Sequence, residues 1–235
     1  MWVFPILAAV VSAVFSALMA QQWLSKQRPH QLAWAIALMM FAVASFAAGI
    51  GILDRWTSTW FQIYYLFGAI VNVPVLALGT IYLLGPRKVG HAVAVIITIA
   101  SIYAAGAVLS AEITLPAAGT AGIPSARSVM PENVRLLSRY YSFTGFFIVV
   151  VGALWSAWRM ARSNEPRLKR LATANILIAA GTFVVAVGSG AARYGQGSIF
   201  AIGLLVGVSL MFWGFLKTRT NAADQAASTA ATGEP

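Results

Sequence analysis

The chain has 235 residues, of which 60% are hydrophobic and only 9% are charged, against about 45–50% and about 25% in an average soluble domain. So much apolar surface excludes a soluble globular protein and indicates an integral membrane protein. The formal charge of +10 lies in short segments between apolar runs, so we expect no nucleic-acid partner, and the lack of cysteine excludes disulfides, thiol catalysis and cysteine-ligated metals.

Seven apolar runs are long enough to cross about 30 Å of hydrocarbon, which takes about 20 helical residues. Each must be a helix, because the bilayer core holds no water to satisfy the peptide groups. We therefore predict an all-α polytopic membrane protein, a seven-transmembrane-helix bundle over 1-219, followed by a disordered cytoplasmic tail over 220-235. The predicted helices lie near 2-24, 32-53, 60-84, 91-110, 136-158, 172-193 and 199-216.

The basic residues alternate between the two sides of the predicted bundle. The connections after the first, third and fifth spans, together with the tail, carry 11 of the 16 lysines and arginines, and the other connections carry 5. Positively charged loops stay in the cytoplasm, so we predict an outside N-terminus, a cytoplasmic C-terminus and a multi-pass location in the cytoplasmic (inner) membrane. The eleven are Lys26, Arg28, Arg87, Lys88, Arg159, Arg162, Arg167, Lys169, Arg170, Lys217 and Arg219; the five are Arg55, Arg127, Arg135, Arg139 and Arg193.

The 60-84 span carries Asn72 near the middle of the membrane. An unpaired amide there costs roughly 1–3 kcal/mol or more, so Asn72 is expected to find a partner. Pro74 has no N–H to donate and clashes with the carbonyl of Ile70, which predicts a kink or a loosened turn. The amide of Asn72 and the loosened turn at Pro74 could form a ligand-binding point or serve only in helix packing. Asn72 shares one helical face with Tyr65, Gly68, Gly79 and Tyr82.

The connection over 111-130 is the longest, and Pro131 with Glu132 predicts that the fifth helix begins before it enters the membrane. The last three spans carry similar faces of small and polar residues. Such faces mark helix contacts, because lipid gives helices no hydrophobic reason to associate, and they serve either as bundle packing or as the lining of a site. They comprise Ser138, Ser142, Gly145, Gly152 and Ser156; Asn175, Thr182, Ser189 and Arg193; and Gly203, Gly207 and Gly214.

Arginines and tyrosines gather near the predicted outer end of the bundle. Guanidinium groups bind carboxylates or phosphates, and tyrosine rings flank the apolar part of an amphiphile. The alternative is a set of snorkelling arginines and interfacial tyrosines. Tyr141 and Tyr194 belong to this group, and Arg193 is the better arginine because it continues an inward face. The candidate ligand-binding residues are Tyr64, Tyr65, Asn72, Arg139, Tyr140, Ser189 and Arg193.

Several chemistries lack the residues that they need. The six acidic residues lie in loops, at helix ends or in the tail, which disfavours ion-coupled transport. His30 and His91 are too few for a haem pair or a histidine-rich metal site, and the last span has no lysine for a retinal Schiff base. No nucleophile with a base can be assembled. We therefore expect neither enzymatic activity nor a cofactor or metal.

Two short runs carry a family resemblance. Tyr64-Tyr65-Leu66-Phe67-Gly68, followed by Leu78-Gly79-Thr80-Ile81-Tyr82-Leu83-Leu84, resembles uncharacterised bacterial seven-helix membrane proteins. It is more loosely similar to the seven-helix sensory input regions of membrane histidine kinases. The resemblance implies a bacterial seven-helix fold and a role in sensing. No kinase or other output domain follows the seventh span, so a signal would need a separate partner.

Three classes of function follow, in order of preference. The first is a receptor-like, non-enzymatic protein that holds a lipid or small amphiphile in an outward-facing bundle cavity. The second is an accessory or assembly subunit of a larger membrane complex, bound through Gly203-x-x-x-Gly207. The third is an uncoupled facilitative transporter that bends at Pro74. The expected partners are membrane lipids, a small amphiphilic ligand and a membrane protein.

Overall fold

The computed structural model describes residues 1–115, 122–163, 165–193 and 196–232, without the side chains of 166–167, 169–171, 193 and 218–232. Within that part the chain is helical and has no strand. Seven helices are long and apolar enough to cross a membrane, and each predicted span corresponds to one of them. The protein is therefore a multi-pass membrane protein by the length and composition of its helices.

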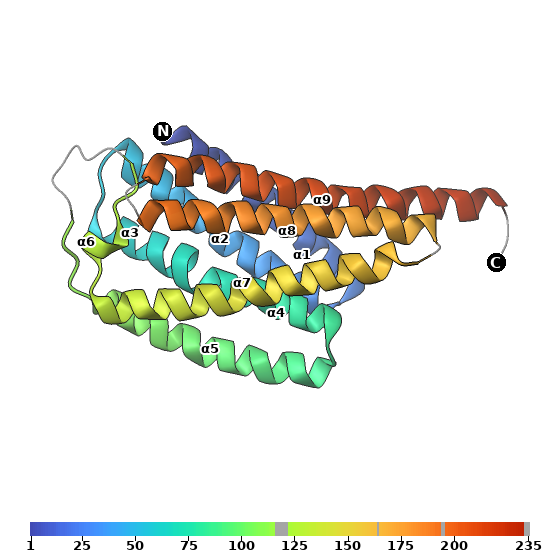
Figure 1. Ribbon diagram of the computed structural model, residues 1–235, viewed down its shortest axis with the longest axis horizontal. Helices are drawn as coiled ribbons and strands as arrows, with labels where there is room; N and C mark the ends of the chain where they lie inside the picture. The colour runs from blue at the N-terminus through green and yellow to red at the C-terminus, as the bar shows by residue number, and fades with distance from the viewer. Residues whose placement is uncertain (116–121, 164, 194–195, 233–235) are drawn as a thin grey trace.

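The long helices lie roughly parallel to one common axis (Figure 1). The third span consists of three consecutive segments, α3, η1 and α4, and lies against α2, α5 and α7. A single turn, α6, lies in the connection between α5 and α7. The elements are α1 (Val3–Lys26), α2 (Pro29–Leu53), α3 (Ser58–Tyr64), η1 (Tyr65–Val71), α4 (Asn72–Leu84), α5 (Arg87–Leu109), α6 (Ala126–Val129), α7 (Glu132–Ala161), α8 (Pro166–Arg193) and α9 (Gly197–Thr232).

Prolines mark where several helices begin. Pro29 stands in the first turn of α2, Pro86 directly precedes α5 and Pro131 directly precedes α7. Proline fits these positions because the first N–H groups of a helix have no partner within it. The predicted start of the fifth helix at Pro131 and Glu132 is confirmed. Here α7 is 30 residues long, which lets it extend beyond a hydrocarbon core of about 30 Å.

The last helix is longer than predicted. In the structure α9 continues as helix to Thr232, whereas the sequence predicted a disordered tail from residue 220. Alanine has the highest helix propensity, and the stretch from Asn221 to Thr232 contains six alanines, which explains why the backbone continues its helical path. The apolar, membrane-spanning part of this helix ends at Lys217.

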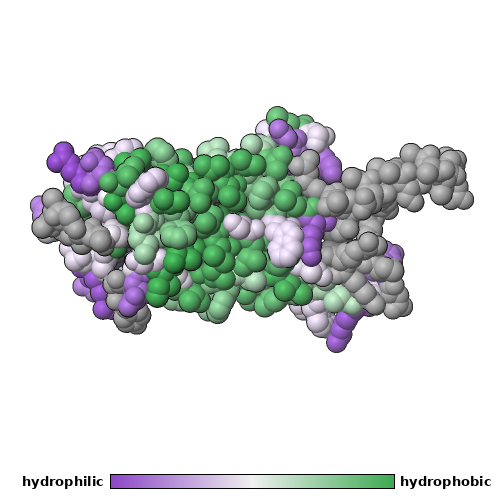
Figure 2. Space-filling model, turned by 90° about the horizontal axis from the view of Figure 1, so that it is seen from above, coloured by the Kyte–Doolittle hydropathy of each residue, from purple (hydrophilic) through white to green (hydrophobic). Residues whose placement is uncertain are grey.

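An apolar band surrounds the middle of the bundle, and hydrophilic residues gather at its two ends (Figure 2). We call the end that holds Met1 and the 111–130 connection the N-terminal face, and the opposite end the C-terminal face (Figure 1). The outward-pointing residues of the band are large and apolar, such as Ile99 and Ile102 of α5, which are 64% and 69% exposed. Such exposure suits contact with lipid tails.

Glycines bring α8 and α9 into backbone contact. A Cβ built on Gly207 would lie 2.8 Å from the carbonyl oxygen of Gly181, and one built on Gly203 would lie 3.6 Å from the Cα of Gly188. The Gly203-x-x-x-Gly207 motif therefore packs α9 against α8 of the same chain. It is occupied within the bundle, which removes the observation that favoured this motif as a docking face for another protein.

Candidate functional site

The third span changes its helical register in the middle. It is π-helical from Tyr65 to Val71 and becomes an α-helix again at Asn72. In the π register an N–H bonds the carbonyl five residues earlier, so Pro74, which has no N–H, leaves the Ala69 carbonyl without that donor. Ser138 and Ser142 of α7 donate to this oxygen instead, at 3.0 and 2.7 Å. The predicted loosened turn before Pro74 is confirmed. Its Ala69 carbonyl receives hydrogen bonds from α7.

The wider turn also changes which tyrosine faces the interior. In a continuous α-helix, residues seven apart share a face, which predicted Tyr65 beside Asn72. The π segment takes up an extra residue, so Tyr64, eight residues before Asn72, lines the same cavity. Tyr65 instead stacks on Phe61, with ring centroids 5.8 Å apart. Tyr64 therefore lines this cavity and Tyr65 does not, although the sequence placed both in the candidate site. A ligand-binding role for either tyrosine stays a prediction.

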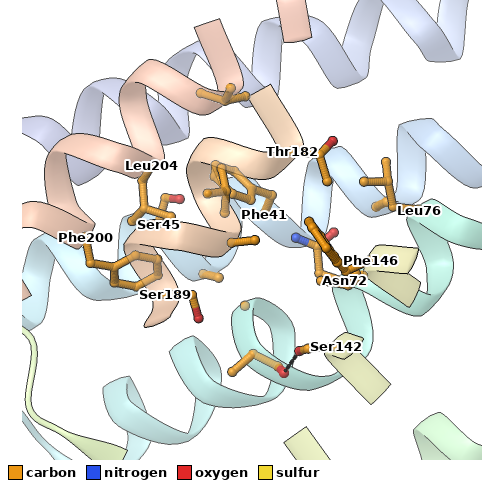
Figure 3. A pocket seen from close by; sticks show the side chains of 18 of the residues that line it. Phe41, Ser45, Asn72, Leu76, Ser142, Phe146, Thr182, Ser189, Phe200 and Leu204 are labelled. Atoms are coloured by element: carbon orange, nitrogen blue, oxygen red, sulfur yellow. Dashed lines mark hydrogen bonds between the residues drawn. The ribbon is translucent and has the colours of Figure 1, made fainter. Parts of the chain in front are cut away.

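A cavity of about 210 Å³ lies in the half of the bundle nearer the N-terminal face, between α2, the third span, α7, α8 and α9. Figure 3 shows Phe200 and Leu204 on one side of it, and Asn72, Phe146 and Leu76 on the other. Most of the lining is apolar. Its polar side chains are Ser45, Tyr64, Asn72, Ser142, Thr182 and Ser189.

Asn72 carries the only amide among the polar side chains that line this cavity, and that amide has no hydrogen-bond partner among the described residues. Its side chain is 7% exposed and lines the cavity, and none of the described residues hydrogen-bonds to it. The hydroxyls of Ser45 and Ser189 likewise have no hydrogen bond among the described residues. By contrast, Thr182 donates to the carbonyl of Ile178 in its own helix, and Ser142 donates to Ala69. The partner that we predicted for Asn72 is therefore absent from the described protein, and the amide faces the cavity (Figure 3).

The cavity opens sideways, between the halves of α7 and α8 nearer the N-terminal face. On the α7 side Phe143 lines it and is 48% exposed. On the α8 side Gly190 lines it, with no atom within 4 Å of the position that a Cβ would take. The two helices also diverge toward this face (Figure 1). An opening at this height and on this side meets lipid in a membrane.

Aromatic rings close the cavity toward the N-terminal face. Tyr64 is 9% exposed, with ring centroids 5.7 Å from Trp56 and 6.5 Å from Phe200. The Trp56 indole donates to the carbonyl of Gly122 at 3.0 Å, which ties the 111–130 connection to this end. These rings lie between the cavity and the N-terminal face, so no opening toward that face is seen in this structure.

The other predicted site residues divide into two groups. Ser189 lines the cavity, as Tyr64 and Asn72 do. Arg139 and Tyr140 do not line it, because both lie on the exposed face of α7, where Tyr140 is 67% exposed. Their neighbour Tyr141 turns to α5 and donates to the carbonyl of Ala100 at 3.1 Å. The predicted arginine-tyrosine mouth is thus not formed by α7. The side chain of Arg193 and the whole of Tyr194 lie outside the described residues.

Sequence reasoning missed the α2 wall of the cavity. Phe41 and Ser45 line it and lie one helical turn apart. The 32-53 span is rich in alanine on every face, so its one serine and two phenylalanines carried no directional signal. Ser142 and Thr182 lie on the polar faces that the sequence identified, so their inward position could be predicted. The sequence did not show that they line a cavity.

A second cavity of about 80 Å³ continues the first toward the C-terminal face. Leu38, Leu76 and Met211 line both cavities and separate them. The second cavity is also lined by Ser156 and Asn175, whose side chains are hydrogen-bonded to each other at 2.9 Å. Its polar groups therefore partly satisfy each other, unlike Asn72.

The site has the chemistry of non-covalent binding. The polar groups of the first cavity are one amide, four aliphatic hydroxyls and the phenol of Tyr64, so they can donate and accept hydrogen bonds but carry no charge near neutral pH. No group of three or more metal-ligating acidic or histidine residues comes together in the described part of the chain. Comparison with protein-family models, with curated proteins and with solved structures gives no match for this chain.

Proposed function

We propose that this protein is a receptor-like, non-enzymatic membrane protein that binds a small, neutral amphiphile taken from the surrounding lipid. The observation that supports this proposal most is the buried, unpaired amide of Asn72 in a mostly apolar cavity that opens sideways. Leaving such a group unpaired costs roughly 1–3 kcal/mol, so a molecule that supplies a hydrogen-bonding group to Asn72 recovers that free energy.

The lining favours a neutral ligand. A carboxylate or phosphate would lose its hydration on entering the cavity and would find no described cation on the walls, which is a large penalty in a low-dielectric interior. Hydroxyl, carbonyl or amide groups lose much less. The anionic ligand considered from the arginines is accordingly less favoured than an alcohol, ester or amide.

The cavity volume sets the size of the bound part. A dry apolar cavity of roughly 150 Å³ holds a benzene molecule. The first cavity, at about 210 Å³, suits a somewhat larger group or one section of a hydrocarbon chain. It is too small for a whole two-chain lipid, so a membrane lipid would insert only part of itself through the opening between α7 and α8.

We also propose that the N-terminal face is outside and that the membrane is the cytoplasmic membrane of a bacterium. The distribution of 11 basic residues on one side and 5 on the other supports this direction. Fluorescent and phosphatase fusions at the two ends should report a cytoplasmic C-terminus and an external N-terminus. Two ends found in the same compartment would contradict both the direction and the seven crossings.

Photolabelling in lipid nanodiscs tests the binding proposal. The probe is n-hexanol with a diazirine at the end of its chain, and the readout is the position of the label by mass spectrometry. We expect label on Leu204 and Val208, which line the cavity and are too buried to be reached from lipid. In N72L the label there should fall about tenfold, since the variant removes the hydrogen-bonding amide.

Asn133 provides the matched control, because it is an exposed amide that does not line the cavity. N133L should label as the unchanged protein does. Absence of label from Leu204 and Val208 in the unchanged protein would refute the binding proposal. Equal label in N72L and N133L would refute the role of Asn72.

A second candidate is an uncoupled facilitative transporter, favoured by the second cavity that prolongs the first and by the π-helical segment beside it. Transport requires Leu38, Leu76 and Met211 to separate. Glycerol uptake into proteoliposomes, followed by stopped-flow light scattering, provides the test. A rate equal to that of protein-free vesicles counts against this candidate for small polar solutes.

A further inference from the structure

We infer, on the basis of the proposed function, that the ligand has a single unbranched hydrocarbon chain, and that this chain passes Leu38, Leu76 and Met211 into the second cavity. The two cavities follow one another along the same helices. On α4 the lining runs from Asn72 through Leu76 to Thr80 and Leu84, which covers about 18 Å at 1.5 Å per residue. On α9 it runs from Phe200 to Met211 and then to Phe215.

The separation between the cavities consists of flexible side chains. Methionine is unbranched and has three rotatable bonds, so Met211 can change rotamer without movement of the backbone. It lies beside Gly181, where a Cβ would be only 2.6 Å from the Cγ of Met211. The missing side chain at Gly181 gives Met211 its space. The two cavities can therefore join through side-chain rearrangement.

The shape of the second cavity selects an unbranched chain. Its volume of about 80 Å³ is well below the roughly 150 Å³ of a cavity that holds benzene, so a ring does not fit. Phe15, Met19 and Phe215 form apolar walls, and the Asn175 amide already donates to Ser156. Methylene groups match these surroundings, and a polar ligand group would gain little there.

Packing, rather than the hydrophobic effect, provides the free energy for this step. A methylene that moves from lipid into a protein cavity leaves one apolar environment for another, so no water is released. What it gains is van der Waals contact with walls that otherwise face empty space. A chain long enough to fill both cavities should therefore bind better than a short chain at the same mole fraction in the bilayer.

The position of a terminal photolabel tests this inference. Two probes are compared in nanodiscs at equal mole fraction: n-hexanol and n-dodecanol, each with a diazirine at the chain end. We expect the dodecanol probe to label Phe15, Met19 or Phe215, which are at most 6% exposed and so are not reached from lipid. The hexanol probe should label Leu204 and Val208 of the first cavity instead.

A variant that fills the second cavity provides the matched comparison. Ala153 lines that cavity, and A153L should reduce dodecanol label on Phe15, Met19 and Phe215 at least tenfold while hexanol labelling stays unchanged. A180L, at an exposed position of α8, should change neither. The wild-type labelling pattern alone decides the inference if A153L does not fold.

The outcomes separate the inference from the proposed function. If dodecanol labels only first-cavity residues such as Leu204, the chain does not pass Met211 and this inference is overturned, while ligand binding stands. If neither probe labels a buried residue of either cavity, the proposed function fails and the inference fails with it. Dodecanol label on Met19 that survives A153L unchanged would also overturn the inference.

Discussion

One helix, α8, meets its two neighbours in different ways. Toward α9 it presents Gly181 and Gly188, and the two backbones touch. Toward α7 it presents Ala186, Ser189 and Gly190, which are also small. The facing residues of α7 are the large Phe143 and Phe146, so the two helices stay apart around a cavity. Small residues therefore close an interface only when the partner surface is small as well. Against large rings the same kind of residues leaves space for a ligand.

Substituting one glycine on each face of α8 should give the largest contrast. A Cβ at Gly181 would lie 2.5 Å from the carbonyl oxygen of Gly207 and 3.0 Å from the Met211 nitrogen, both backbone atoms. G181A should lower the free energy of unfolding by about 1–3 kcal/mol through overpacking. G190A meets no atom and should raise it by up to about 1 kcal/mol, since alanine favours helix.

Unfolding in mixed micelles, followed by tryptophan fluorescence, measures this pair of variants. Equal effects of G181A and G190A would mean that the two faces of α8 do not differ as described.

Removing the hydrogen bonds between α7 and the π segment should have a smaller effect on the free energy of unfolding. S142A removes one of two donors to the Ala69 carbonyl and should cost about 0.5–1.5 kcal/mol of unfolding free energy, and S138A with S142A about 1–3 kcal/mol, because a buried carbonyl loses both. The control is S110A, whose exposed hydroxyl bonds within its own helix at 2.8 Å. A double variant no less stable than S110A would show that α7 does not hold the π segment.

Closing the side opening should have the smallest effect on stability and a large effect on binding. G190L adds a side chain at the rim, where open space receives it, and should change the unfolding free energy by no more than about 1 kcal/mol. Label from the n-hexanol probe on Leu204 should fall at least tenfold. G106L, at an equally open position on α5, should leave the labelling as it is. Unchanged labelling in G190L would place the opening elsewhere.

Much of the fold could be predicted because the helical conformation of each apolar run does not depend on its neighbours. A run of about 20 residues in lipid must satisfy its peptide groups internally, whatever its neighbours are. The loosened turn before Pro74 could be predicted in the same way, since proline lacks an N–H in any context. Asn72 and Ser189 stood on inward faces, and both line the cavity.

The rest of the site depended on how the helices are rotated. The extra residue in the π segment turns Tyr64, and not Tyr65, toward the cavity. The side-chain spacing of an α-helix does not predict this shift. Arg139 and Tyr140 lie on the exposed face of α7 because Ser138 and Ser142, on another face, bond to Ala69. These bonds join residues about 70 positions apart along the chain, so local patterns did not reveal them.

The amino-acid sequence by itself determined the membrane-spanning helices and the polar residues that avoid lipid, because hydropathy and backbone hydrogen bonding act within each segment. Only the tertiary structure decided that glycine contacts close α8 against α9 while Phe143 and Phe146 hold α7 away and leave Asn72 facing an opening. The packing of two helices depends on the side chains of both facing surfaces, and the sequence of one segment specifies only one of these surfaces.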